Sequence, residues 1–195
     1  MTPGILPTIY DEVIATTPIR HTDDRGWFSQ TYSRKEDIAA GIQTTYVQDN
    51  HSYSHSAGTI RGFHFQRPPF AQAKLVRCLR GSIMDYVVDI RRDSSTFGTV
   101  VSFLVSKNVG NQVYIPEGYA HAFITLEKNT EIAYKVSQDY SPEHEGGLKW
   151  DDQILSIDWP LSGATPEISA KDRNWPSLSS AGPLPTHAEW RAKHP

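Results

Sequence analysis

The sequence contains little of what marks several large classes of protein. Cys78 is the single cysteine among 195 residues, which excludes an intrachain disulfide, and its apolar surroundings predict a buried strand residue. No run reaches the ~18–20 apolar residues that a membrane-spanning helix requires. Residues 1–13 also lack the basic and apolar regions of a signal peptide. We therefore expect a cytoplasmic protein with no membrane partner.

Positive charge is equally scarce. The 19 Lys and Arg residues are outnumbered by 22 Asp and Glu residues, the net charge is −3, and no basic tract is present. Nucleic acid is therefore not an expected partner, although a local arginine pocket for a phosphate group is compatible with this composition. A hydrophobic fraction of 38% with a charged fraction of 21% is typical of a folded, soluble chain.

The length suits one domain with a short extension. After Trp159-Pro160 the composition shifts towards Ser, Pro, Gly and Ala. We predict one domain over residues 1–176 and a loosely held C-terminal tail over residues 177–195.

Helical patterns are few. One short helix is predicted within residues 33–41, where Ser33 is a candidate N-cap and Gly41 a stop. Most other segments are short, rich in β-branched and aromatic residues, and interrupted by Gly, Pro, Asn or Asp. This pattern predicts an all-β protein with few short helices.

The clearest strand covers residues 82–90. Its alternation directs Met84, Tyr86, Val88 and Ile90 to one face and the aspartates Asp85 and Asp89 to the other. Further strands are predicted at residues 99–105, 112–115, 120–126 and 131–136. Their even spacing, with turn residues between them, is typical of a β-sandwich or jelly roll.

Two segments resemble the conserved motifs of the cupin family. Residues 115–121 contain P-x-G-x-x-H ending at His121, and residues 58–66 resemble the other motif, in which a Gly precedes H-x-H. Here His64 is retained, but Gln66 replaces the second histidine and Lys74 stands near the position of the glutamate ligand. The resemblance implies a jelly-roll barrel whose interior carries these four side chains.

These replacements argue against a metal site. Lys74 cannot coordinate a metal while it is protonated, and its charge repels a divalent cation. We therefore expect no metal. Single histidines in strands are often satisfied core residues, but a cluster of two histidines, a lysine and an arginine requires a compensating anion or a function.

Longer motifs give a more specific resemblance. Residues 48–52, 59–66, 72–78, 88–92, 115–118 and 169–172, in this order, resemble the dTDP-4-dehydrorhamnose 3,5-epimerase family of deoxysugar biosynthesis. The resemblance covers roughly residues 10–175. It implies inversion of C3 and C5 of a nucleotide-linked 4-keto-6-deoxyhexose, for polysaccharide biosynthesis, without a cofactor.

The chemistry that the resemblance implies requires a base, an acid and a stabiliser of negative charge. The C4 ketone acidifies the protons on C3 and C5, and reprotonation of the enolate from the other face inverts the centre. His64 is the expected base and Asp172 its orienting partner. Lys74 is expected to stabilise the enolate, and Tyr134 to act as the acid on the opposite face.

The resemblance also implies the substrate contacts. Arg25 and Arg61 correspond to diphosphate contacts, and Gln30 stands where the family has a glutamate that contacts thymine. Other expected contacts are Gln48, Asp49, Asn50, His121, Tyr140, Glu145 and Lys171. The family forms homodimers in which N-terminal strands cross to the partner, so we expect a homodimer with strand exchange.

Several alternatives remain open. Asp172 could belong to a surface pair with Arg173, Tyr134 could be a core residue, and Arg25 could lie in an ordinary turn. Because Gln30 both donates and accepts hydrogen bonds, it could pair with cytosine as well as thymine. The alternative functions are a single-centre epimerase, acting for example on a CDP-linked sugar, and a sugar-binding cupin without catalysis.

Overall fold

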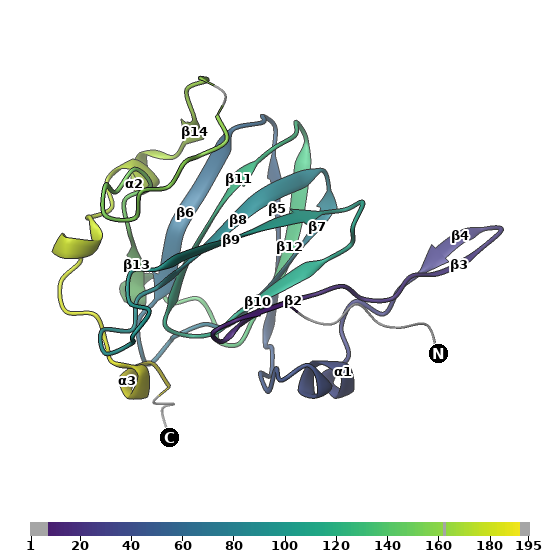
Figure 1. The fold of residues 1–195 in the computed structure, drawn as a ribbon, viewed down its shortest axis with the longest axis horizontal. Helices are drawn as coiled ribbons and strands as arrows, with labels where there is room; N and C mark the ends of the chain where they lie inside the picture. The colour runs from purple at the N-terminus through teal and green to yellow at the C-terminus, as the bar shows by residue number, and fades with distance from the viewer. Residues whose placement is uncertain (1–7, 162, 192–195) are drawn as a thin grey trace.

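Two facing β-sheets form the body of the protein (Figure 1). The computed structural model describes residues 8–161 and 163–191. The first sheet has the order β1 (Thr8–Tyr10), β2 (Val13–Thr16), β10 (Gln112–Ile115), β7 (Lys74–Arg80), β12 (Thr130–Val136) and β5 (Gln48–Ser54). The second has the order β13 (Glu145–Gly147), β6 (Thr59–Gln66), β11 (Tyr119–Thr125), β8 (Ser82–Asp89) and β9 (Val100–Ser106).

Short elements surround the two sheets. Strand β14 (Glu167–Ile168) adds to β6 in parallel, and it leads directly into helix α2 (Ala170–Arg173). The other helical elements are α1 (Arg34–Ala39), α3 (His187–Arg191) and the 3-10 turns η1 (Pro142–His144) and η2 (Leu178–Ser180). This architecture confirms the predicted all-β jelly roll with a few short helices. None of the described helices has the length and apolar composition that a membrane crossing requires.

The predicted helix and the predicted main strand are both present. Ser33 occupies the N-cap position of α1 without a side-chain capping bond, and Gly41, just past the helix, adopts a left-handed φ of 91°. Strand β8 has the predicted alternation, and the face that carries its aspartates points between the two sheets. Asp85 and Asp89 are therefore buried, at 0% and 2% exposure, where they pair with other side chains.

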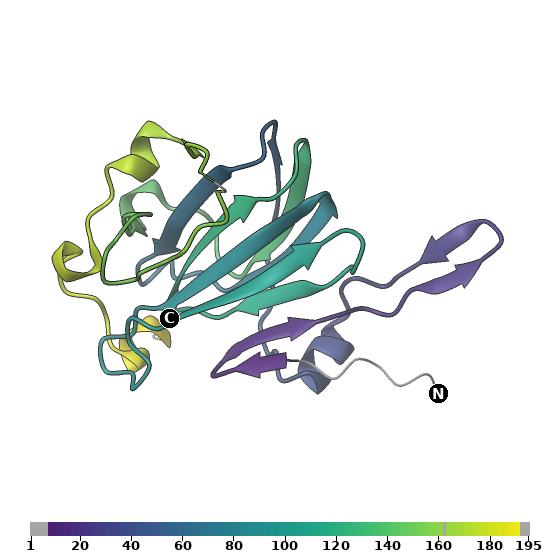
Figure 2. The ribbon, with the colours of Figure 1, turned by 45° about the horizontal axis from the view of Figure 1, so that its top comes forward.

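The core has two main layers. One layer lies between the sheets and includes Val76, Val87 and Ile132. The other lies on the outer face of the second sheet, where Phe63 and Tyr86 pack against Trp159. Figures 1 and 2 show that the chain after β13 wraps over this second sheet.

The C-terminal segment differs from the prediction. Residues 177–195 were expected to be loosely held, but in the part described, up to Arg191, Leu178, Leu184 and Trp190 are buried in the outer core layer. Trp190 packs edge-on against Phe65 at a centroid distance of 5.8 Å. The Ser- and Pro-rich composition of this segment did not predict the packing, because only three apolar side chains, spaced along the segment, are buried.

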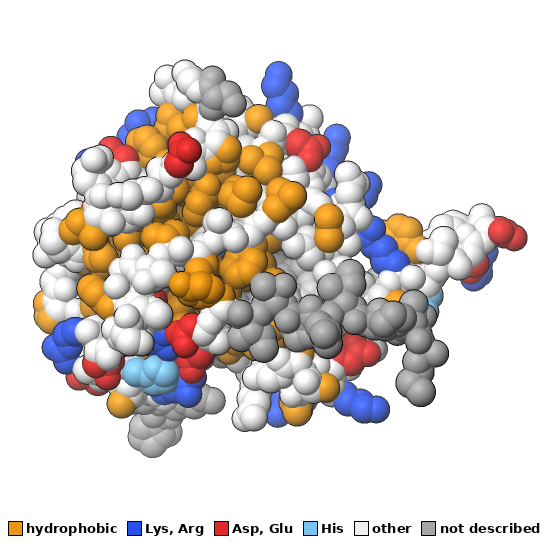
Figure 3. All heavy atoms as spheres, in the orientation of Figure 1, with side chains coloured by type: hydrophobic (Ala, Val, Ile, Leu, Met, Phe, Trp, Pro, Cys, Tyr) orange, Lys and Arg blue, Asp and Glu red, His pale blue; other side chains and the backbone are white. Residues whose placement is uncertain are grey.

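Two surface features remain uncovered. The hairpin of β3 (His21–Asp23) and β4 (Gly26–Phe28) projects away from the body (Figures 1 and 2). On it, Trp27 and Phe28 are 55% and 69% exposed. Figure 3 shows hydrophobic side chains gathered over the middle of the face that carries β8 and the edge strand β9.

Candidate active site

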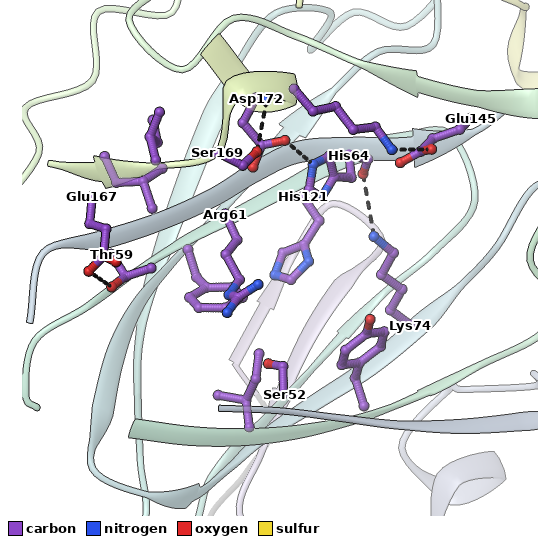
Figure 4. A pocket seen from close by; sticks show the side chains of 16 residues that line it. Ser52, Thr59, Arg61, His64, Lys74, His121, Glu145, Glu167, Ser169 and Asp172 are labelled. Atoms are coloured by element: carbon purple, nitrogen blue, oxygen red, sulfur yellow. Dashed lines mark hydrogen bonds and ion pairs between the residues drawn. The ribbon is translucent and has the colours of Figure 1, made fainter. Parts of the chain in front are cut away.

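A cavity of about 490 Å³ opens between the two sheets (Figure 4). Strand β6 forms one wall and carries Arg61 and His64, while β7 and β12 of the facing sheet carry Lys74 and Tyr134. Helix α2 closes one side with Asp172. The structure therefore brings the four expected catalytic side chains to one cavity.

A β-bulge lets Arg61 and His64 share this cavity. The pairing of β11 with β6 shifts between His121↔His64 and Phe123↔Arg61, so β6 contains one more residue than β11 over this stretch. Arg61 and His64 are three residues apart and would face opposite ways in a regular strand. At the bulge Gly62 has φ 119°, and a Cβ there would lie 2.5 Å from the carbonyl oxygen of His121.

His64 and Asp172 form a hydrogen-bonded dyad. His64 Nε2 lies 2.7 Å from Asp172 Oδ1, and the Gly62 N–H donates to Asp172 Oδ2 over 3.3 Å. Burial opposes ionisation of Asp172, but the bonds and charge of His64 outweigh it, so the pKa of this carboxyl is lowered. An ionised carboxylate only accepts hydrogen bonds, so Nε2 of His64 carries the hydrogen and Nδ1 is the basic nitrogen.

Local structure fixes Asp172 in this position. Strand β14 pairs with β6, and Ser169 Oγ accepts the Asp172 N–H over 3.0 Å as the N-cap of α2. Beyond the helix, Trp175 lies so close to Gly147 that a Cβ on that glycine would meet the indole at 2.4 Å. Gly147 is itself paired with His64. The surface-pair alternative for Asp172 and Arg173 is therefore wrong for Asp172, which is 4% exposed.

Lys74 supplies a buried cation. Its Nζ lies 3.4 Å from the carbonyl oxygen of His64. Burial lowers the pKa of Lys74 to about 8, while the charges of Asp85 and Glu145 oppose the shift. The ammonium form therefore predominates at neutral pH, but it loses its proton at a lower pH than the ammonium group of a surface lysine does.

A second dyad includes an aspartate that was not predicted as a site residue. His121 Nε2 lies 2.5 Å from Oδ1 of Asp85 on the neighbouring strand β8. Burial, with the charges of Lys74 and His64, lowers the pKa of His121 despite the opposing effect of Asp85. His121 is thus a neutral imidazole that donates from Nε2 and keeps Nδ1 as an acceptor in the cavity. In the sequence, only the alternation of residues 82–90 indicated that Asp85 lies on the opposite strand face from the apolar residues.

Tyr134 stands on the wall opposite β6. Burial raises the pKa of its phenol, although the positive charge of Arg61 opposes this. The phenol therefore keeps its proton at neutral pH and is available as a donor.

A smaller lobe of about 270 Å³ adjoins the catalytic side chains and is lined by amides. Gln48 and Asn50 of β5 face this lobe and are joined by a 2.7 Å hydrogen bond. At its rim, Tyr140 donates to Glu145 over 2.6 Å, and Lys171 pairs with the same carboxylate. These residues were all expected as substrate contacts.

Gln66 does not take part in a ligand set. Its amide donates to the carbonyls of Phe70 and Asp139, both at 3.1 Å, and accepts the Ser141 N–H at 2.7 Å. Gln66 therefore stabilises the two loops that contain these residues against strand β6. Within residues 8–161 and 163–191 no three His, Cys, Asp or Glu side chains are grouped so as to hold a metal ion. The absence of a metal from the working enzyme stays a prediction.

Three expected substrate contacts line neither the main cavity nor its smaller lobe. Arg25, on the projecting hairpin, pairs with Asp23 at 2.6 Å. Asp49 points to the outer face of the first sheet, where it pairs with Lys135 at 2.9 Å, because its neighbour Asn50 points inward. Asp49 and Gln30 instead line a separate hollow of about 450 Å³. Their contact with substrate stays a prediction.

Several lining residues were not predicted from the sequence. They are Ser52, Thr59, Ile60, Phe123, Ile132, Glu167, Ile168 and Ser169. Ser52 follows Gln48 and Asn50 at the strand period and could have been found by that alternation. Glu167 and Ser169 had no such signal, because β14 is two residues long.

Comparison with known proteins identifies close relatives. The family model described as dTDP-4-dehydrorhamnose 3,5-epimerase matches residues 7–180. A protein of that name from Sinorhizobium fredii is 46% identical over 86% of this chain and 85% of its own length.

Two solved structures are also similar. One is the dTDP-6-deoxy-D-glucose-3,5-epimerase of Legionella pneumophila, in complex with dTDP-4-keto-L-rhamnose. It has a TM-score of 0.87, 37% identity, and coverage of 94% of this chain and 98% of that one. The other is a 3'-monoepimerase from Streptomyces bikiniensis in complex with dTDP-quinovose, with a TM-score of 0.87, 31% identity and 96% coverage of both chains.

Proposed function

Because this chain belongs to the dTDP-4-dehydrorhamnose 3,5-epimerase family, we propose that it converts dTDP-4-dehydro-6-deoxy-D-glucose to dTDP-4-dehydro-L-rhamnose. It is an isomerase of the epimerase class. The observation that carries the proposal is the meeting of the His64–Asp172 dyad, Lys74 and Tyr134 in one cavity from two facing sheets.

The first step is proton abstraction beside the ketone. Nδ1 of His64 takes the proton from C3 or C5, and the electron pair of the C–H bond moves to the C4 oxygen as an enolate. Asp172 stabilises the imidazolium that forms, and the Lys74 ammonium stabilises the enolate oxygen. Because Lys74 lies within the buried cavity, this charge attraction is stronger than it would be in water.

The second step delivers a proton to the other face of the sugar. Tyr134 lies on the sheet opposite His64 and donates its phenolic proton to the enolate carbon. The phenolate then regains a proton from solvent, as His64 loses its own. The configuration is inverted because the proton leaves to one wall of the cavity and arrives from the other.

Substrate contacts are distributed around this centre. Arg61 and Lys171 supply positive charge for the diphosphate. The neutral His121, held by Asp85, accepts a hydrogen bond from a sugar hydroxyl. The amides of Gln48 and Asn50 and the Tyr140–Glu145 pair complete the sugar site.

The proposal includes a homodimer with exchanged N-terminal strands. The projecting hairpin leaves Trp27 and Phe28 exposed, and Arg25 lies outside the cavity of its own chain. A second copy that received the hairpin would cover these rings and bring Arg25 and Gln30 to a nucleotide site. A cytoplasmic location is also proposed, since a charged nucleotide sugar does not cross a bilayer unaided.

Proton exchange in deuterated water tests the function. We expect the enzyme to incorporate deuterium from solvent at both C3 and C5 of the dTDP-linked 4-keto sugar, followed by nuclear magnetic resonance. Exchange at one centre would indicate a single-centre epimerase, as in the Streptomyces bikiniensis relative. A protein that binds the sugar without exchange at either centre would refute the catalytic proposal.

A further inference from the structure

The main cavity changes in chemical character along strand β6 (Figure 4). His64 and Lys74 occupy one end, Arg61 lies in the middle, and Thr59 and Glu167 occupy the other end. At ~3.3 Å per residue, the five steps along the chain from Thr59 to His64 span up to ~16 Å. The cavity therefore offers a reactive end, a cationic middle and an anionic end.

Glu167 is held at the anionic end by its backbone. Strand β14 aligns Glu167 with Thr59, and the Glu167 N–H donates to the Gly58 carbonyl over 3.0 Å. The Thr59 hydroxyl lies 3.3 Å from Glu167 Oε2 and 3.1 Å from the Ser56 carbonyl oxygen. Glu167 is exposed, and within the described part of the chain no side chain or backbone N–H donates to its other carboxylate oxygen, Oε1.

A carboxylate at this position selects its ligand by charge and by hydrogen bonding. It repels phosphate, and it accepts hydrogen bonds from hydroxyl and N–H groups. The substrate class under the proposed function has three parts in linear order, which are the sugar, the diphosphate and the nucleoside. With the sugar at His64 and Lys74 and the diphosphate at Arg61, the nucleoside extends towards Glu167.

We propose that Glu167, oriented by Thr59, is a specificity-determining residue that accepts a hydrogen bond from the nucleoside part of the substrate. The donors available there are the deoxyribose 3'-hydroxyl and the N3–H of a thymine-type base. This inference rests on the proposed function. The contrasting role for Glu167 is a purely structural one, in which it joins β14 to β6 and so supports Asp172.

The test compares a nucleoside diphosphate with a diphosphate that has no nucleoside. In Glu167→Ala we expect inhibition by dTDP to weaken ~10-fold, as for loss of a hydrogen bond to a charged group. Inhibition by inorganic pyrophosphate should be unchanged or stronger, because a nearby negative charge has been removed. KM for the nucleotide sugar should rise while kcat stays within ~2-fold.

Two further variants complete the experiment. Glu167→Gln keeps an acceptor oxygen and should bind dTDP more tightly than Glu167→Ala. Glu36→Ala removes an exposed carboxylate from α1, outside both cavity lobes, and should change neither inhibitor. It therefore controls for net charge.

Three outcomes would overturn the inference. Equal weakening of dTDP and pyrophosphate would mean that Glu167 affects the diphosphate site, and no change in either would mean that it contacts neither. A fall in kcat with loss of thermal stability would assign Glu167 the structural role. If wild-type protein neither binds dTDP nor exchanges substrate protons, the proposed function fails, whatever the Glu167 variants do.

Discussion

The proposed role of His64 as the base depends on a residue that is 108 positions away in the chain. The 2.7 Å bond to Asp172 fixes Nε2–H and leaves Nδ1 to act as the base in the proposed mechanism. His64→Asn should lower kcat by ~10²–10⁴-fold, the usual cost of losing a general base. Deuterium exchange at both C3 and C5 should fall together. Exchange near the wild-type rate in a correctly folded variant would assign the base to another residue.

The proposed role of Lys74 predicts an alkaline limit to catalytic activity. Its pKa is lowered to about 8 by burial, so the ammonium form is present below that pH and is lost as the pH rises through it. We expect kcat to decline above about pH 8, because the neutral amine stabilises the enolate poorly. In Lys74→Met the rate should be low at every pH and this decline should be absent. A wild-type profile that stays level to pH 10 would contradict the assignment.

Substitution of Tyr134 should separate the exchange of substrate protons with solvent from the inversion of the sugar carbon. Because His64 still removes the proton in Tyr134→Phe, substrate protons should still exchange with solvent while the epimerised product forms slowly. The measurement is deuterium content against product ratio in the same sample. Equal losses of both would mean that Tyr134 only positions the sugar.

At the scale of elements, the bulge in β6 assembles the site. Gly62→Ala would place a Cβ 2.5 Å from the His121 carbonyl oxygen at a φ of 119°. We expect a loss of ~1–3 kcal/mol in the free energy of unfolding, measured with denaturant, together with loss of activity. Gly182→Ala is the matched control, since its φ of 74° is also left-handed but no atom lies within 4 Å of the added Cβ. Equal effects in both variants would mean that the close approach at Gly62 has no special cost.

At the scale of the whole molecule, Arg91 joins the two ends of the chain. It is 3% exposed and pairs with Asp89 at 2.7 Å, with Glu12 at 2.6 Å, and with Asp11. Arg191 of α3 also pairs with Glu12. Within the described residues, positions 88–92 line neither cavity lobe, and the ion pairs of Arg91 fix the N-terminal turn against the C-terminal helix.

The proposed dimer makes a whole-molecule prediction. Arg25→Ala and His64→Asn should each be nearly inactive, but subunits mixed after denaturation and refolding should regain activity. If Arg25 serves the partner's cavity, each mixed dimer has one intact site, so about a quarter of wild-type sites return. No recovery, with mixed dimers verified by mass, would mean that Arg25 acts within its own chain or not at all.

The sequence by itself determined the fold class and located most of the proposed catalytic residues. Strand alternation and turn residues sufficed for β8 and α1, and the cupin-like motifs located His64, Lys74 and His121, because these signals are local. The tail was misjudged, since three spaced apolar residues decide its packing.

Only the tertiary structure decided which side chains meet. Asp85 joined the site through His121, and Glu167 through a two-residue strand, while Asp49 turned to the outer face. The bulge at Gly62 brought Arg61 and His64 to the same cavity, although regular strand alternation would place them on opposite faces. A strand's pattern depends on near neighbours, but its register, bulges and partners are set by packing between segments that are far apart in the chain.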